Sequence, residues 1–180
     1  DIWHARQAAS TPGEDLISFL AHGEATKNMA PNEFLGNVLL LIVGGNDTTR
    51  NSISAGVQAL NRFPEEYDKL KGNANLIPSM VSEIVRWQSP VAHMCRTAMA
   101  DVEIGGQQIR KMDKLAIWYL SGNRDESHFA DANRLIIDRP NVRQHLAFGY
   151  GIHRCLGNRL AEMQLKILWE EIMARFSHVE

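Results

Sequence analysis

Residues 148–157 concentrate the residue types of this chain that could do chemistry, in the order Phe-Gly-Tyr-Gly-Ile-His-Arg-Cys-Leu-Gly. Gly149 and Gly151 allow backbone angles and close approaches that a Cβ would forbid, as expected where a loop passes against a flat cofactor. Cys155 falls where a helix is expected to begin, and there unpaired N–H groups and the helix dipole favour a thiolate over a thiol. Gly157 would keep the first helical turn thin. The segment therefore predicts a thiolate presented on a loop shaped by glycines.

Other roles for the two cysteines are weaker. A single cysteine is more often a small buried hydrophobic residue, and we expect this of Cys95. That role would leave the spaced glycines around Cys155 unexplained, and no second ligand pair completes a tetrahedral zinc site. Two cysteines in 180 residues do not make a disulfide scaffold, so we expect a reducing, cytoplasmic location.

A second chemical pattern lies inside the long helix expected over residues 31–63, where residues 44–49 read Gly-Gly-Asn-Asp-Thr-Thr. Glycines and an Asp-Thr pair each cost a helix interior up to about 1 kcal/mol relative to alanine. A hydrogen bond from the Thr48 hydroxyl to the Gly44 carbonyl would bend the helix and open a groove. By itself the pattern fits equally well a kinked helix with Asp47 on the surface.

A third pattern, Glu83 and Arg86, places an acid and a base on one helix face. Surface pairs of this kind are common and contribute little stability, so the pair alone carries no functional assignment.

Composition excludes several classes of protein. The 19 basic and 21 acidic residues nearly cancel and are interspersed, so neither a nucleic-acid footprint nor a polybasic membrane patch is expected. The apolar stretch 38–43 is far shorter than the about 20 residues of a membrane span. We therefore expect no nucleic-acid partner and no membrane span.

Hydrophobic periodicity predicts a mainly α fold with a small β-sheet region. Helices are expected over residues 14–22, 31–63, 65–71, 78–87 and 156–176, strands over 102–104 and 114–120 around a turn at 105–106, and irregular structure over 121–145. Apolar stripes are expected on two of these helices, formed by Ile77, Val81, Ile84 and Val85, and by Leu160, Met163, Leu165, Ile167, Leu168 and Ile172.

Residues 148–157 resemble the haem-ligand loop of the cytochrome P-450 superfamily. All six positions of the pattern Phe-Gly-x-Gly-x-His-x-Cys-x-Gly match. The resemblance implies haem b, with Cys155 as the axial thiolate ligand of its iron. It covers essentially all 180 residues and implies that residues 1–180 are the C-terminal haem-binding part of a single cytochrome P-450 domain, a fragment whose N-terminal half is absent.

The same resemblance implies roles for further residues. Phe148 would shield the thiolate, and His153 and Arg96 would donate to haem propionates, although either could be a simple surface cation. Gly44 would lie against the cofactor, Thr48 would act on bound dioxygen, and Asp47 would relay protons. Glu83 and Arg86 would join a later arginine, Arg139, in a structural network that supports the haem loop.

Residues 39–52, 81–97 and 118–125 most resemble the bacterial branch that hydroxylates the terminal carbon of medium-chain alkanes and fatty acids, which implies an alkane 1-monooxygenase. Apolar residues at positions that face the substrate pocket in the family are Leu40, Val43, Val91, Ala92 and Met94. Two residues depart from the branch: Cys95 replaces a usual arginine, and Met112 replaces an expected glycine. The resemblance implies electrons from NAD(P)H through a reductase and ferredoxin; a peroxygenase and a non-catalytic haem-thiolate sensor are the alternatives.

Overall fold

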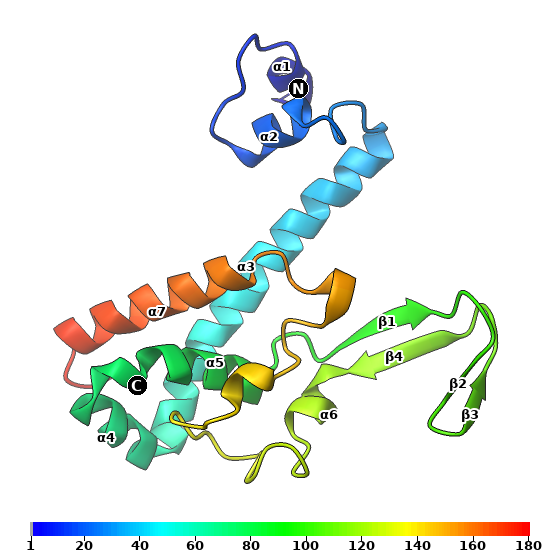
Figure 1. The fold of residues 1–180 in the computed structure, drawn as a ribbon. Coiled ribbons are helices and arrows are strands. Elements are labelled where there is room, and N and C mark those ends of the chain that lie inside the picture. The colour runs from blue at the N-terminus through cyan, green and yellow to red at the C-terminus, as the bar shows by residue number, and fades with distance from the viewer. Residues whose placement is uncertain (1) are drawn as a thin grey trace. The chain divides into compact units, whose positions relative to one another are not determined.

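The computed structural model describes residues 2–180, which divide into a smaller unit up to Val43 and a larger unit from Gly44 to Glu180. The fold is helical with small antiparallel sheets, which confirms the predicted fold class (Figure 1). None of the helices among the described residues is long and apolar enough to cross a membrane.

The smaller unit contains α1 (Ile2–Gln7), α2 (Leu16–His22) and the beginning of α3. Helix α2 confirms the helix predicted over residues 14–22, whereas α1 was not predicted. Asp15 caps α2, because its side chain accepts a hydrogen bond from the Ser18 backbone N–H at 2.9 Å. The rings of Trp3 and Phe34 stack with their centroids 4.2 Å apart, which packs α1 against the start of α3.

Helix α3 (Pro31–Arg62) confirms the long predicted helix. Pro31 occupies its first turn, where a missing N–H costs nothing, and the helix ends two residues before Pro64. Helix α3 continues without interruption through residues 44–49.

The core of the larger unit lies between the second half of α3, helix α5 (Ile77–Gln88) and helix α7 (Asn158–Arg175). All four residues of the predicted α5 stripe are buried. Gly56 lets α3 approach closely, since a Cβ there would lie 2.8 Å from the Trp169 ring and 3.0 Å from Ile84 Cδ1. Helix α4 (Pro64–Gly72) and the short 3-10 helix η1 (Ala74–Leu76) connect α3 to α5.

The strands form two separate antiparallel pairs. Strand β1 (His93–Thr97) pairs with β4 (Lys114–Trp118), and β2 (Val102–Ile104) pairs with β3 (Gln107–Ile109) across the predicted turn, where both glycines have positive φ. The predicted strand over 114–120 is two residues too long, because Tyr119 begins α6 (Tyr119–Asn123). Residues 124–157 are irregular apart from two 3-10 turns, η2 (Val142–Gln144) and η3 (Gly151–His153).

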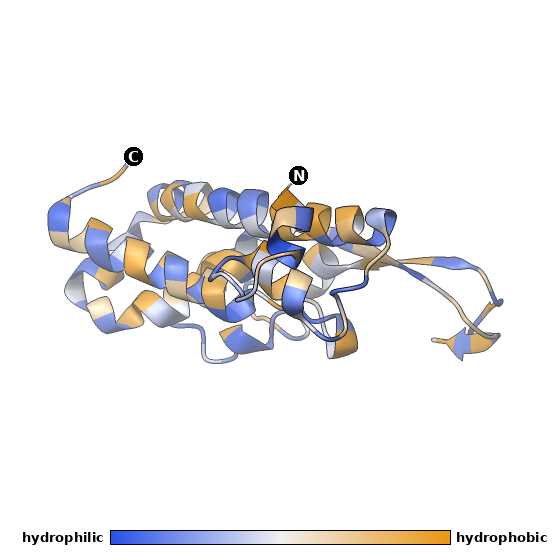
Figure 2. Cartoon of the chain, turned by 90° about the horizontal axis from the view of Figure 1, so that it is seen from above, coloured by the Kyte–Doolittle hydropathy of each residue, from blue (hydrophilic) through white to orange (hydrophobic). Residues whose placement is uncertain are grey.

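Two burial predictions are wrong. Cys95 is exposed rather than buried. It lies on β1, which pairs with β4 alone, and the first three residues of β1 are exposed. In α7 only Leu165 of the predicted stripe is fully buried, while Leu160, Met163 and Ile167 are about half exposed. Leu165 and Trp169, four residues apart, form the face that packs on the core, and Figure 2 shows hydrophobic and hydrophilic residues interspersed along the helices.

Candidate functional site

The loop before α7 has the backbone that its glycines predict. Gly149 and Gly151 have φ values of +68° and +69°, in the left-handed region that residues with a Cβ rarely adopt. A Cβ on Gly149 would also lie 3.3 Å from the Tyr119 hydroxyl. The loop is closed by a hydrogen bond from the Cys155 N–H to the Phe148 carbonyl at 2.8 Å, which fixes Cys155 relative to Phe148.

Cys155 is a free, exposed cysteine at the end of this loop. Helix α7 begins at Asn158 with Gly157 as its N-cap, so the predicted start at residue 156 is two residues too early. Cys155 therefore precedes the helix rather than occupying its first turn. Its neighbours Ile152 and Leu156 are 97% and 94% exposed, which leaves an uncovered apolar surface beside the thiol.

This surface fits the flat, apolar face of a haem. A Cβ on Gly151 or Gly157 would meet nothing within 4 Å, so there is open space beside both of these glycines, which flank Cys155. An exposed cysteine with exposed apolar residues beside it in the loop is a donor arrangement that suits haem-thiolate ligation.

Phe148 and His145 lie behind the loop. Their rings are 5.3 Å apart, and Phe148 packs against the buried core. Burial, assisted by the positive charges of Arg154 and Arg86, lowers the pKa of His145 to about 4. The neutral ring can therefore accept the hydrogen bond that the Ala147 N–H offers to Nδ1 at 3.2 Å.

In α3 the Thr48 hydroxyl donates a hydrogen bond to the Gly44 carbonyl at 2.7 Å, as predicted. A Cβ on Gly44 would meet nothing within 4 Å, so one side of this turn is open. Asp47 is exposed and forms an ion pair with Arg50 at 2.9 Å. The predicted residues Gly44, Asp47 and Thr48 thus lie within the same two turns of α3.

Glu83, Arg86 and Arg139 form the predicted network, and all three are buried. Glu83 accepts two hydrogen bonds from Arg86, at 2.7 and 2.8 Å, and one to each oxygen from Arg139 Nε at 3.2 Å. Its Oε1 also accepts the Ile136 N–H at 2.9 Å. The remaining guanidinium donors bond to backbone carbonyls, so each buried charge has partners.

Two further residues of this network were missed by sequence reasoning. The Phe129 ring contacts the guanidinium groups of both Arg86 and Arg139, whose central carbons lie 5.2 and 5.9 Å from the ring centroid. Buried Asn123 accepts the Leu146 N–H at 2.6 Å through its side chain and the Arg86 guanidinium at 2.6 Å through its carbonyl. Asn123 therefore links the network directly to the residues that lead into the Cys155 loop, and no sequence signal marks it.

The remaining predicted residues are less constrained. Arg96 donates to the neighbouring Cys95 carbonyl at 2.9 Å, and His153 is exposed, so their roles toward propionates stay predictions. The expected substrate pocket draws on residues of both units and also stays a prediction. Leu40, Val43 and Met94 are exposed, and Val91 and Ala92 are half-buried.

Comparison with known proteins defines the class. The cytochrome P450 family model matches residues 4–180, and the chain belongs to this family. Two solved structures with similar folds are Cytochrome P450-153 from Novosphingobium aromaticivorans (TM-score 0.91, 52% identity) and CYP153D17 from Sphingomonas sp. PAMC 26605 (TM-score 0.90, 55% identity). The matches cover 97% and 96% of this chain and 43% of each of those chains.

Among relatives of named activity, the linalool 8-monooxygenase of Pseudomonas putida is 46% identical over 100% of this chain and 44% of its own length. The methyl-branched lipid omega-hydroxylase of Mycobacterium tuberculosis (strain ATCC 25618 / H37Rv) is 41% identical over 92% of this chain and 39% of its own length. The chain thus spans less than half the length of these relatives.

Proposed function

We propose that residues 1–180 are the C-terminal haem-binding part of a single-domain haem-thiolate monooxygenase that inserts one atom of dioxygen into an unactivated C–H bond. The observation that carries the proposal is Cys155, exposed among apolar side chains on a loop held by two positive-φ glycines. Family membership supports haem b as the cofactor. Bound there, haem would supply dioxygen activation, and the thiolate ligand favours O–O cleavage.

The residues around Cys155 would hold and shield the cofactor. Phe148 lies against the core at the base of the loop, where its ring would limit access of water to the thiolate. Arg96 and His153 would donate to the propionates, which are the charged edge of haem. The buried network of Glu83, Arg86 and Arg139 would keep the loop in place through Asn123 and Leu146.

Proton delivery would belong to α3. The Thr48 hydroxyl donates its one hydrogen to the Gly44 carbonyl, so its oxygen is left as an acceptor on the open side of the helix. Asp47 is exposed to solvent and can exchange protons with water, after releasing Arg50, as a relay requires. A peroxygenase or a non-catalytic haem sensor needs no such relay, so Asp47 and Thr48 favour the monooxygenase.

The proposed substrates are medium-chain alkanes or fatty acids, hydroxylated at the terminal carbon. Support comes from the printed name of a relative, an omega-hydroxylase of methyl-branched lipids, and from the apolar character of Leu40, Val43, Val91, Ala92 and Met94. Other relatives are named as monooxygenases of linalool and of the C26 position of a steroid, so the named substrates do not share a carbon skeleton. Electrons would come from NAD(P)H through a ferredoxin reductase and ferredoxin in the cytoplasm.

Product analysis with Thr48→Ala tests this function. With an alkane substrate, the complete wild-type enzyme should form the terminal alcohol. Thr48→Ala should bind the substrate equally well but form roughly two- to tenfold less alcohol per NAD(P)H consumed. The reason is that the variant lacks the Thr48 oxygen, which accepts a hydrogen bond worth about 1 kcal/mol in the proposed relay. Thr49→Ala is the matched control, since among the described residues the Thr49 hydroxyl has no hydrogen-bond partner. Equal coupling in both variants would remove Thr48 from the mechanism.

A further inference from the structure

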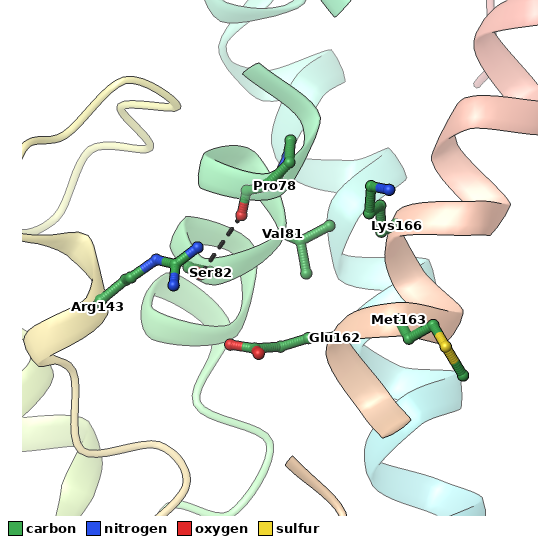
Figure 3. A pocket seen from close by; sticks show the side chains of 7 residues that line it. All are labelled: Pro78, Val81, Ser82, Arg143, Glu162, Met163 and Lys166. Carbon is green, nitrogen blue, oxygen red and sulfur yellow. Dashed lines mark hydrogen bonds between the residues drawn. The ribbon is translucent and has the colours of Figure 1, made fainter. Parts of the chain in front are cut away.

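Two neighbouring cavities lie between η2 and the first half of α7. Of the residues assigned above to the haem site, Phe148 lines the smaller cavity, and the other lining residues have no role in the proposed oxygen chemistry. The larger, of about 180 Å³, is lined mainly by apolar atoms of α5 and α7. Figure 3 shows Arg143 and Glu162 reaching into it from opposite sides, one from η2 and the other from α7. The smaller cavity, of about 100 Å³, shares these two residues and is lined almost wholly by polar ones.

Three guanidinium groups line the smaller cavity, those of Arg143, Arg154 and Arg159. Across residues 2–180, none of these three side chains forms a hydrogen bond or an ion pair. Glu162 supplies the single carboxylate of the cavity and is also unpaired within that part of the chain. Within the part of the chain that the structure describes, these three exposed arginines and one carboxylate leave an excess of two positive charges at the cavity.

Two further features of the cavity bear on its charge. Asn158, which lines it, is the first residue of the 18-residue helix α7, whose N-cap Gly157 forms no side-chain cap, so free N–H groups and the helix dipole add positive potential. His145 lines the same cavity, and burial first, then the charges of Arg154 and Arg86, lowers its pKa to about 4.

We propose that this cavity is a binding site for a phosphate-type oxyanion, as inorganic phosphate or a phosphate ester. Guanidinium groups donate parallel pairs of hydrogen bonds to such oxygens, and helix N-termini bind them through backbone N–H groups. The excess of two positive charges matches the dianion of phosphate better than a single carboxylate. None of the residues that line the cavity is a substrate or proton-relay residue proposed above, and the anion site does not depend on the monooxygenase assignment.

Calorimetric titration of the complete, haem-loaded protein with inorganic phosphate tests the proposal, at an ionic strength held constant with chloride. We expect saturable binding of one phosphate. Arg143→Gln and Arg159→Gln should each weaken it about tenfold, because each removes a charged hydrogen-bond donor. Arg110→Gln, which removes an exposed arginine outside the cavity, should change nothing.

Glu162→Gln separates loss of the site from loss of folding. It removes the one negative charge of the cavity and should tighten phosphate binding severalfold, a gain that a misfolded variant cannot produce. Absence of saturable phosphate binding, equal binding by both arginine variants and the wild type, or weaker binding by Glu162→Gln would each overturn the proposal. Acetate binding as tightly as phosphate would overturn the assignment to a phosphate-type anion.

Discussion

Met112 has a φ of +77°, in the left-handed region where a Cβ is crowded, at the turn where the family resemblance expects a glycine. Its N–H donates to the Ala98 carbonyl at 2.8 Å, and its side chain is exposed. The backbone of the turn therefore has the geometry of a glycine although its residue is a methionine.

Met112→Gly should stabilise the protein by up to about 1 kcal/mol, because relief of left-handed strain exceeds the extra entropy that glycine loses on folding. Urea unfolding measures the change. Met99→Gly is the control, since Met99 is similarly exposed and has no positive φ, and it should not stabilise. A Met112→Gly protein no more stable than the wild type would mean that the turn carries no strain.

His145 gives a second prediction at this scale, a loss of stability in weak acid. Its pKa is about 4 in the folded chain against 6.5 when unfolded, so the unfolded state binds the proton more tightly between those values. The contribution of His145 to the free energy of unfolding is therefore fully present above pH 6.5. It falls by between about 1 and 3 kcal/mol as the pH drops toward 4.

His145→Asn places an amide oxygen where Nδ1 accepts the Ala147 N–H, without a titrating group. The difference in unfolding free energy between wild type and this variant, measured across pH 4 to 8, isolates the contribution of His145. A difference that does not vary with pH would show that folding does not lower the pKa of His145.

At single residues, sequence reasoning succeeded where local geometry decides the outcome. The positive φ values of Gly149 and Gly151 and the hydrogen bond from Thr48 to Gly44 depend on neighbours within a few positions, and they were predicted. The burial of Cys95 depends on what covers a strand from another part of the chain, and that prediction was wrong.

At the scale of the elements, a single carboxylate, that of Glu83, binds two buried arginines where α5 meets the irregular segment after α6. Glu83 compensates both Arg86 and Arg139, and the Arg86 guanidinium reaches the carbonyls of Asn123 and Ala132. Residues 124–141 have no regular structure of their own, so these hydrogen bonds take the place of a sheet or helix.

Glu83→Gln should therefore destabilise the protein by about 3 to 5 kcal/mol, because it leaves two buried guanidinium groups facing a neutral amide. Glu65→Gln is the matched control, since Glu65 pairs with Arg134 on the surface, and it should cost less than about 1 kcal/mol. Denaturant unfolding of both variants gives the comparison. Equal losses of unfolding free energy in Glu83→Gln and Glu65→Gln would show that the buried Glu83 network contributes no more stability than a surface ion pair.

The elements also show why sequence patterns stop short. The motif Glu83 to Arg86 fixes one face of α5, and its partner Arg139 was found only through the family resemblance. Asn123 carries no motif, because a buried asparagine is defined by the three segments that meet at it. The stripe of α7 was misplaced for the same reason. The apolar residues of α7 cover more than one face, and the packing of its Leu165 and Trp169 on the core selects the face that is buried.

At the scale of the whole molecule, exposed apolar surface follows the proposed cofactor site. Tyr150, Ile152 and Leu156 are each more than 80% exposed in the loop, and Leu160 and Met163 continue this exposure along α7. The chain spans less than half the length of its relatives. A haem and further chain on these surfaces would bury them, which agrees with the proposal that the 180 residues belong to a larger domain.

The central claim is that Cys155 is the thiolate ligand of a haem iron. The most direct test is the carbon-monoxide difference spectrum of the reduced complete protein, because thiolate ligation shifts the Soret band characteristically. We predict the thiolate-type band in the wild type and in Cys95→Ser, and its loss in Cys155→Ser. A wild type without that band, or a Cys155→Ser variant that keeps it, would contradict the account.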